Sequence, residues 1–341
     1  MMKSFKKALV VGLSLMLFAT VAVTGLAQGT RRPSAPLSAP ALASALPASD
    51  TVALVKVKRV LDEAMPKLLS SNPAKLAEIN AQIDNFKSRT GIDPRAFDEL
   101  AMGVKYEYPS PGVLKLATVA VARGSFSATA FVAAGRTAES GKYREEKYQG
   151  KTIYVFTIDQ QLRVLGLLDL RIKELAVSAL DANTLALGDV RRVRSAIDAM
   201  KGPRRANAEL IALANQDPNA IMGFGGNITP ALLEHLRIGN DAVAKDLAAM
   251  RQLYGHVGMT DKDIEVLTAA RMVDPASARS LGSTVEGLSA FAGVFLNRLP
   301  AAKAALAKSA VGNLKVTVLG NDLQLRTSVA QTEVGPVMQG R

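Results

Sequence analysis

Residues 314–329, LKVTVLGNDLQLRTSV, indicate how this chain folds. Two runs that alternate between apolar and polar residues flank a Gly-Asn-Asp turn at positions 320–322. Strands joined by so short a turn pair antiparallel. In the second run, alternate positions from Leu323 to Val329 are apolar or threonine, and the positions between them are polar. One buried and one solvated face favour an antiparallel sheet with helices on one side.

Predicted hairpins and helices alternate over the rest of the chain as well. Strand-like runs are predicted at residues 51–58, 100–108, 113–123, 143–148, 151–158, 174–180, 184–187, 220–226, 253–259 and 264–273. Helical spacing and capping residues predict helices at residues 60–69, 74–89, 125–138, 189–200, 241–250 and 274–297, and one that begins at Thr229. One face of the run at 100–108 carries Met102, Val104, Tyr106 and Tyr108.

The order strand, helix, two strands and helix occurs at 51–138 and again at 220–297. We therefore expect an α+β fold made of two duplicated halves of antiparallel sheet, with helices packed on one face. The expected boundaries are 50–202 for the first half, 203–334 for the second half and 335–341 for a disordered tail.

The N-terminus has the three parts of an export signal. Three lysines lie in the first seven residues, an uncharged apolar run covers Ala8–Val23, and small residues follow at Gly25 and Ala27. We expect a signal peptide at 1–27, cleaved after Ala27. The alternative is an uncleaved anchor helix, which needs about 20 apolar residues. Residues 28–49 hold four prolines among alanine and serine, which predicts a Pro/Ala/Ser-rich linker.

Composition excludes several chemistries. The 341 residues include no cysteine and only two histidines, so disulfides, cysteine-ligated metals, thiol nucleophiles and three-histidine metal sites are all ruled out. We expect no cofactor. No later apolar run is long enough to span a bilayer, so no transmembrane segment is expected after signal cleavage. Cleavage lowers the net charge from +12 to +9, because the signal holds three lysines and no acid.

Two features that could indicate chemistry have structural interpretations. The run GFGGN at 223–227 lies between a strand and a helix, where a phosphate-binding turn would lie, but it lacks the third glycine and the P-loop lysine. We interpret these residues as strand glycines that let another backbone approach closely. His235 and His256 have no partner at metal-ligand spacing and are interpreted as structural or surface residues.

The densest charge lies at 189–205, DVRRVRSAIDAMKGPRR. An apolar stripe at helical spacing leaves the basic side chains on the other sides of this helix. Two interpretations stay open, a contact with an anionic lipid or polysaccharide and a solvated helix face. The candidate contact residues are Arg191, Arg192, Arg194, Lys201, Arg204 and Arg205. Nucleic acid is not an expected partner, because export and the lack of interleaved aromatic residues argue against it.

Three blocks of the sequence are similar to a known group. TGIDP at 90–94, YQGKTIY at 148–154 and LDANTLALGD at 180–189 resemble a group of uncharacterised exported bacterial proteins, and the resemblance covers residues 46–334. It implies export and a shared fold. It implies no catalytic residue, because the similar motifs are turns and helix caps and contain no reaction signature.

Together these features predict an exported protein, periplasmic or extracellular and able to associate with a membrane, that is not an enzyme. We expect it to bind a partner protein of the bacterial envelope or an anionic surface. Two alternatives stay open. One is a soluble carrier of an apolar or lipidic ligand, held between sheet and helices, and the other is an unrecognised hydrolase with a carboxylate pair formed only in three dimensions.

The signal peptide can be tested directly. Protein recovered from a bacterial host is expected to begin within a few residues of Gln28, because Gly25 and Ala27 mark the cleavage site. N-terminal sequencing measures this. Recovery of most molecules with Met1 or Met2 intact would show that the segment is kept as an anchor.

Overall fold

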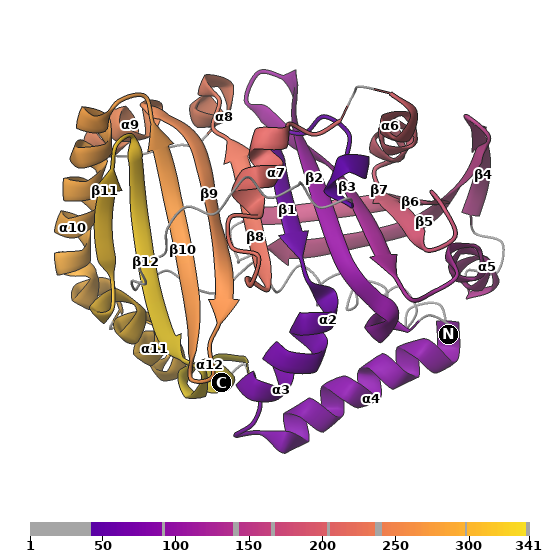
Figure 1. The fold of residues 1–341 in the computed structure, drawn as a ribbon, viewed down its shortest axis with the longest axis horizontal. Helices are drawn as coiled ribbons and strands as arrows, with labels where there is room; N and C mark the ends of the chain where they lie inside the picture. Colours follow the sequence, from indigo (N-terminus) through magenta and orange to yellow (C-terminus); the bar gives the residue numbers. More distant parts are fainter. Residues whose placement is uncertain are drawn as a thin grey trace.

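The computed structural model describes residues 42–90, 93–138, 143–164, 168–202, 205–235, 241–296 and 299–338. This part of the chain forms one sheet of twelve strands with helices packed against it (Figure 1). Each strand pairs antiparallel with its neighbours. The α+β class expected from the sequence is confirmed.

The strands overlap the predicted runs, although the run at 51–58 is a strand only as far as Val55 and the runs at 151–158 and 174–180 fall in longer strands. They are β1 (Thr51–Val55), β2 (Phe97–Ser110), β3 (Val113–Gly124), β4 (Tyr143–Tyr148), β5 (Lys151–Val164), β6 (Leu168–Ala179), β7 (Thr184–Gly188), β8 (Met222–Asn227), β9 (Met250–Met259), β10 (Asp263–Met272), β11 (Lys315–Leu319) and β12 (Asp322–Ala330). Their order across the sheet is β11-β12-β10-β9-β8-β1-β2-β3-β7-β6-β5-β4.

The helical segments lie between these strands and at the start and end of the described chain. They are η1 (Ala43–Ala45), α2 (Val57–Arg59), η2 (Val60–Ala64), α3 (Met65–Leu68), α4 (Pro73–Thr90), η3 (Pro94–Ala96), α5 (Ala128–Ala138), α6 (Val190–Lys201), α7 (Ala208–Ala214), α8 (Pro230–His235), α9 (Asp241–Ala248), α10 (Pro275–Leu296), α11 (Ala301–Gly312) and α12 (Gln331–Met338). Within the described residues, no helix combines the length and apolar character needed to cross a membrane.

The two halves of the chain share one continuous sheet, because β1 pairs with both β2 and β8. Counted outward from the central pair, the first half runs β1, β2, β3, β7, β6, and the second half runs β8, β9, β10, β12, β11. Strands β5 and β4 extend the first half further. A duplication would produce this correspondence, but an origin by duplication stays a hypothesis.

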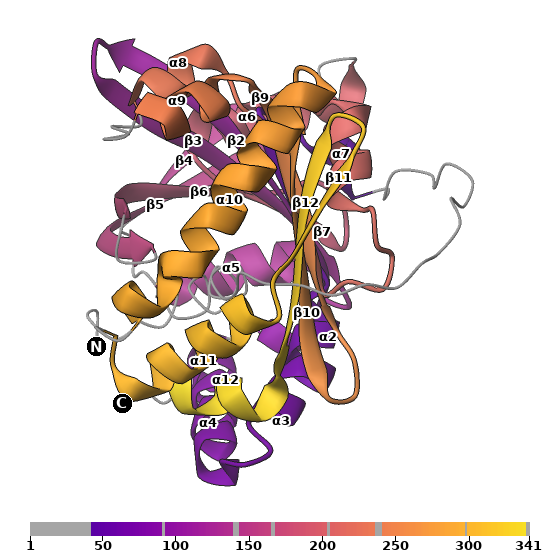
Figure 2. The same cartoon turned by 90° about the vertical axis from the view of Figure 1, so that its left-hand side faces the viewer.

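The sheet carries helices on both faces, so the expectation of helices on one face only is wrong. We call face A the side to which the side chain of Val52 points, and face B the side to which the side chains of Ala53 and Phe224 point. Gly225, the partner of Val52 on β8, is at a face A position. Helices α6 and α7 cover face A, whereas α5, α10 and α11 lie on face B, as the edge-on view shows (Figure 2). The polar positions of the last hairpin lie on face A, which α6 and α7 cover only over the middle and the first half of the sheet.

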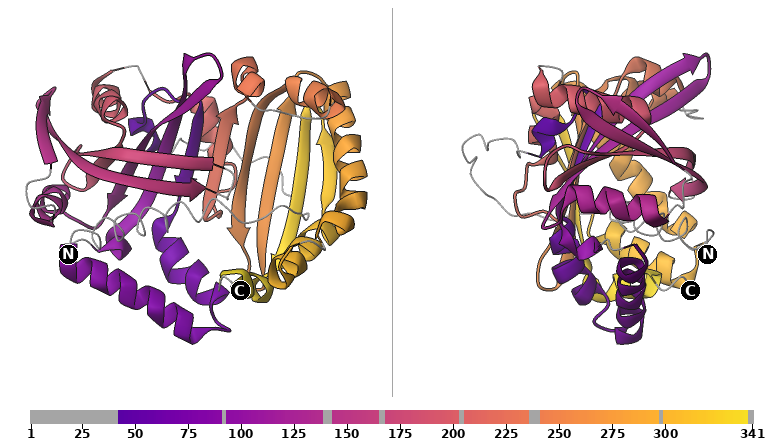
Figure 3. Two further views of the ribbon diagram at one scale, coloured as in Figure 1. Left: turned by 180° about the vertical axis from the view of Figure 1, so that it is seen from behind. Right: turned by 90° about the vertical axis from the view of Figure 1, so that its right-hand side faces the viewer.

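The first half of the sheet is strongly curled. The outer part of the β5–β6 hairpin turns back across face B, where it passes over β1, β2 and β3 when the molecule is seen from behind (Figure 3). The edge-on view places the same hairpin on the face B side of the sheet (Figure 2). Face B of the central strands therefore lies between this hairpin and α10.

Residues 42–49, which the sequence assigns to the linker, belong to the core. Leu42 and Leu46, on either side of η1, are 2% and 0% exposed and pack in the face A core with α6. The amide of Ala206 donates a hydrogen bond to the carbonyl of Leu46. Prolines prevent a long helix but allow short 3-10 and extended segments. The many prolines in this stretch therefore predicted a linker, although two of its leucines are buried.

The expected tail is also shorter than predicted, because residues 335–338 are part of α12. Residues 339–341 lie outside the described residues. The signal peptide and linker residues 28–41 lie outside them as well.

The glycines of β8 have the structural role predicted for them. A Cβ atom on Gly223 would lie 2.1 Å from the carbonyl oxygen of Ala214, and one on Gly225 would lie 2.7 Å from the Cβ of Leu213. Both contacts are with α7, which packs directly on the backbone of β8. The interpretation that these glycines allow close backbone approach is confirmed.

The core role of residues 42–49 leads to a stability prediction. Leu46→Ala is expected to lower the free energy of unfolding by about 2–5 kcal/mol, because it leaves a cavity in the face A core. Urea denaturation followed by circular dichroism measures this. The matched control is Leu288→Ala, at a side chain that is 60% exposed, with an expected change within about 0.5 kcal/mol. Equal effects of the two substitutions would contradict the packing described for η1.

Candidate functional site

Helix α6 carries the basic residues singled out in the sequence. Of the apolar stripe expected at Val190, Val193, Ile197 and Met200, the two middle residues are buried in the face A core together with Ala196. Val190 is half-buried, and Met200 at the end of the helix is 38% exposed. Asp189 lies at the N-cap, but its carboxylate accepts hydrogen bonds from the amide and hydroxyl of Thr118 on β3 and not from the helix. This carboxylate therefore fixes the start of α6 to the sheet.

The basic side chains of α6 form contacts within the protein. Arg191 donates to Glu107 at 2.8 Å, and Lys201 donates to the carbonyl of Gln149 at 3.1 Å. Arg194 forms a two-point contact with Glu146, which holds the pKa of that carboxyl below its usual range. Arg205 donates to the carbonyl of Ala199 at the end of the helix, and Arg204 lies outside the described residues.

Arg192 differs from the other basic residues because it is buried, with 7% of its surface exposed. Its guanidinium donates to the carbonyl of Ala48 at 3.0 Å and to the hydroxyl of Ser49 at 2.7 Å. Burial lowers its pKa. The five described candidates therefore do not share one exposed basic face, and Arg192 anchors the segment that leads into β1.

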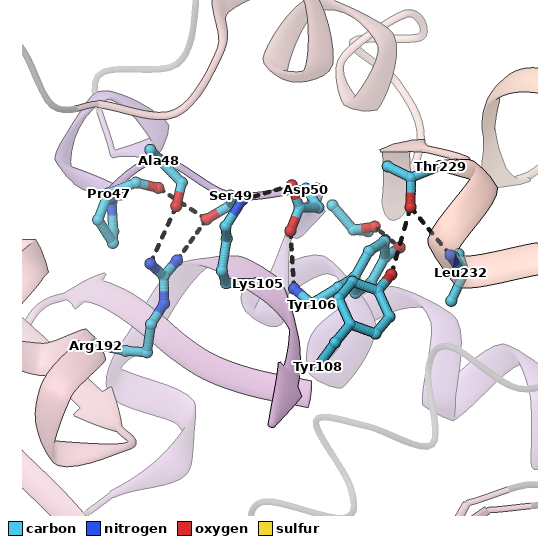
Figure 4. A network of polar contacts seen from close by, with 11 residues as sticks. Pro47, Ala48, Ser49, Asp50, Lys105, Tyr106, Tyr108, Arg192, Thr229 and Leu232 are labelled. Atoms are coloured by element: carbon cyan, nitrogen blue, oxygen red, sulfur yellow. Dashed lines mark hydrogen bonds and ion pairs between the residues drawn. The ribbon is translucent and has the colours of Figure 1, made fainter. Parts of the chain in front are cut away.

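Asp50 continues this network toward β2 (Figure 4). One carboxylate oxygen pairs with Lys105 at 2.8 Å, and the other accepts a hydrogen bond from the amide of Tyr106 at 2.8 Å. Asp50 and Lys105 precede residues that point to face B, so both lie at face A positions. The charges at this end of β1 are thus paired on the face A side.

On face B, the same end of the sheet carries four hydroxyl groups. The oxygens of Thr51 and Tyr106 lie 2.6 Å apart, and those of Tyr108 and Thr229 lie 3.4 Å apart. Figure 4 shows the phenol of Tyr108 directed toward Thr229. We call Thr51, Tyr106, Tyr108 and Thr229 the hydroxyl cluster.

Two further observations define the hydroxyl cluster. Burial raises the pKa of Tyr106, so this phenol keeps its proton well above neutral pH. The ring of His235 lies against that of Tyr108, with centroids 5.0 Å apart, and Nδ1 of His235 lies 2.7 Å from the carbonyl oxygen of Ala231. A carbonyl oxygen can only accept, so Nδ1 carries a hydrogen, and the other ring nitrogen, Nε2, has no hydrogen-bond partner among the described residues.

Next to the cluster, part of the middle of face B is apolar and half-buried, whereas Val55 and Met222 at the other end of β1 and β8 are buried. Six neighbouring side chains on β1, β2, β8 and β9 share this surface, which we call the central strip: Ala53, Met102, Val104, Phe224, Leu253 and Val257. The ring of Phe224 lies over Gly255, since a Cβ atom there would be 3.1 Å from the ring. Toward the two ends of the sheet, face B packs against α5 or α10 and holds both buried and half-buried side chains. Leu175 and Leu323 are buried there, and Leu187 and Leu325 are half-buried.

Helix α10 flanks the strip and carries an apolar stripe that the sheet only partly covers. Ala278 and Leu281 are buried against β10 and β12, and Val285 packs beside them. Leu288, two turns beyond Leu281 on the same side of the helix, is 60% exposed. The first half of α10 is therefore packed on the sheet, and its stripe becomes exposed farther along.

The two histidines lie in different surroundings. His256 on face A has its Nε2 atom 3.7 Å from Asp217, and burial lowers its pKa. His235 lies beside the hydroxyl cluster. Within the described ranges, no three histidine, aspartate or glutamate side chains come together as metal ligands would.

No family model matches the chain, and no curated protein matches its sequence. Solved structures of the Treponema protein TP0453 are similar to it. Crystal forms III, I and IV of that protein give TM-scores of 0.44, 0.44 and 0.46 with sequence identities of 11%, 10% and 11%. The matches cover 88–89% of this chain and 97–99% of the other. At TM-scores below 0.5, this likeness carries no argument about function.

Sequence reasoning found half of the hydroxyl cluster. The alternation in residues 100–108 correctly places Met102, Val104, Tyr106 and Tyr108 on one face. It could not show that Thr51 and Thr229 meet these tyrosines, because those contacts cross 55 and 121 residues of sequence. The only local signal was a threonine at the start of one strand and another just after the end of a second.

The burial of Arg192 leads to a prediction about α6. Arg192→Gln is expected to lower the free energy of unfolding by about 1–3 kcal/mol, because it leaves the carbonyl of Ala48 and the hydroxyl of Ser49 without their donor. Arg191→Gln removes only an exposed ion pair and is expected to change it by less than about 1 kcal/mol. Chemical denaturation of both variants measures the difference. If Arg191→Gln were the more damaging, the roles assigned to these two neighbours would be wrong.

Proposed function

We propose that this protein is a non-catalytic binding protein of the bacterial envelope that carries an apolar ligand on face B. One observation carries the proposal, namely that the central strip keeps its apolar side chains half-buried in the middle of a sheet. The middle of a sheet is normally its most completely covered part. An apolar surface left partly uncovered there is typical of a site that another molecule covers.

The energetics support a ligand that is itself apolar. Each square ångström of apolar surface removed from water contributes about 25 cal/mol, so covering the strip would be favourable. The strip is flanked by α10 and by the overhanging β5–β6 hairpin (Figures 2 and 3). On α10, Leu288 lies on the same side of the helix as Leu281 and is 60% exposed. A ligand held between sheet and helix would contact both.

Binding of an anionic surface through α6 has less support. Arg191 and Arg194 are paired with acids, and Arg192 is buried, so little of the charge of this helix is free for a partner. A catalytic role also has less support, because the strip presents apolar side chains and its polar neighbours are four hydroxyls and the imidazole of His235. Export rests on the N-terminal signal and is part of the proposal.

The proposal predicts saturable binding of an uncharged apolar dye. N-phenyl-1-naphthylamine is expected to bind the purified protein with increased fluorescence. Phe224→Gln is expected to weaken binding about tenfold, which corresponds to losing roughly 1.4 kcal/mol of apolar contact in the middle of the strip. Fluorescence titration measures the affinity.

The matched control is Leu319→Gln, the same kind of exchange at a side chain that is 57% exposed and lies on β11, outside the strip. It is expected to leave dye binding unchanged. Circular dichroism establishes that both variants are folded. Absence of saturable binding by the wild type, or equal binding by the two variants, would contradict the proposal.

A further inference from the structure

We infer that the ligand is a single-chain amphiphile with an uncharged head group, whose chain lies on the central strip and whose head group binds the hydroxyl cluster. This inference rests on the proposed function, which by itself specifies only an apolar ligand. The chemistry that selects the head group is the presence of four hydroxyls beside an apolar strip on the same face of the sheet.

The apolar and polar parts of the site follow one strand. On β2, Met102 and Val104 belong to the strip, and Tyr106 and Tyr108 belong to the cluster. Successive residues of a strand rise about 3.3 Å, so these four side chains extend over roughly 20 Å in one line. On β1, Ala53 and Thr51 repeat the same order beside them. A molecule lying along these strands would meet apolar side chains first and hydroxyls at one end.

The hydrogen bonds within the hydroxyl cluster do not use all of its hydroxyl hydrogens. Thr51 and Tyr106 share one hydrogen bond, in which either can donate, so one of their two hydroxyl hydrogens has no acceptor in the part of the chain that the structure describes. The same count holds for Tyr108 and Thr229, whose oxygen also accepts from the amide of Leu232. Among the described residues, two hydroxyl hydrogens thus have no acceptor, and they can donate to oxygen atoms of a head group. An ester or polyol head group offers such acceptors.

The charges nearby favour a head group without charge. Lys105 and Glu107 alternate with the tyrosines and lie at face A positions. Lys105 is paired with Asp50 at 2.8 Å, and Glu107 is paired with Arg191 at 2.8 Å and with Lys115 at 3.5 Å. No described lysine or arginine is therefore left beside the cluster on β2 to neutralise an anionic head group. Burying an unpaired charge would be unfavourable.

The test compares three ligands of equal chain length as competitors for the dye. Monolauroylglycerol has an uncharged polar head group, dodecane has none, and laurate has a negative one. The wild type is expected to bind monolauroylglycerol more tightly than the other two. Tyr106→Phe and Tyr108→Phe are each expected to weaken monolauroylglycerol binding about three- to tenfold and to leave dodecane binding unchanged.

The matched control is Tyr148→Phe. Tyr148 lies on β4, away from the strip, and its phenol hydroxyl donates to Asp198 of α6 at 2.9 Å. It is expected to leave the binding of all three ligands unchanged. Thermal unfolding of each variant establishes that it is folded. Tyr108 is 36% exposed, so its variant is expected to fold even if Tyr106→Phe does not.

The outcomes separate this inference from the proposed function. Equal affinity for monolauroylglycerol and dodecane, with no effect of the tyrosine variants, would overturn the head-group assignment and leave the apolar carrier intact. Tighter binding of laurate would overturn the uncharged class. If none of the three ligands displaced the dye and the dye itself bound no better than to the Phe224→Gln variant, both proposals would fail together.

Discussion

The pairing of β1 with strands on both sides is the constraint on which the rest of this structure depends. β1 has five residues, and each of them is in register with β2 on one side and with β8 on the other. Because β8 is the first strand of the second half of the chain, this pairing joins two half-sheets into one. On β1, Val52 lies in the face A core, whereas on face B Ala53 lies on the half-buried strip and Val55 is buried.

Glycine in β8 decides how the two faces differ. Without side chains at Gly223 and Gly225, α7 packs directly on the backbone and closes face A. The core there contains residues from distant parts of the chain, including Leu46, Ile197 and Tyr254. Tyr254 adds a hydrogen bond to Asp322, and burial raises its pKa to about 12. Face A therefore provides much of the packing that holds the halves together, and face B can remain partly open.

The sequence predicted the elements of this fold well and their assembly less well. Hairpins such as β11–β12 and β9–β10 were predictable because their alternation and turns are local. Which side of a strand is covered depends on helices that lie elsewhere in the sequence. The expectation of helices on one face was therefore wrong. The buried η1 was missed for a related reason, since its flanking leucines are surrounded in sequence by prolines and alanines typical of a linker.

The basic helix shows the same limit in electrostatic terms. Sequence identifies which residues of α6 are charged, and it places Val193 and Ile197 correctly on the buried face. It misplaces Met200, which is exposed. It does not identify the acceptors, which lie 84 residues away for Arg191, 48 for Arg194 and 144 for the carbonyl that Arg192 meets. A cluster of arginines in a sequence therefore indicates either a binding surface or a set of hydrogen bonds and ion pairs within the protein. The structure provides internal partners for each arginine of α6.

The composition of the strip explains how a half-covered apolar surface is tolerated in a stable fold. Two of the face B positions that border it, Gly226 and Gly255, have no side chain, and Ala53 has only a methyl group. Small residues keep the apolar area exposed to water low, and therefore also keep low the free-energy cost of leaving the strip uncovered. The larger side chains, Met102 and Phe224, lie beside these small ones and leave an uneven surface. Methionine adapts its shape to irregular contacts, which suits a surface that has to be stable both empty and covered.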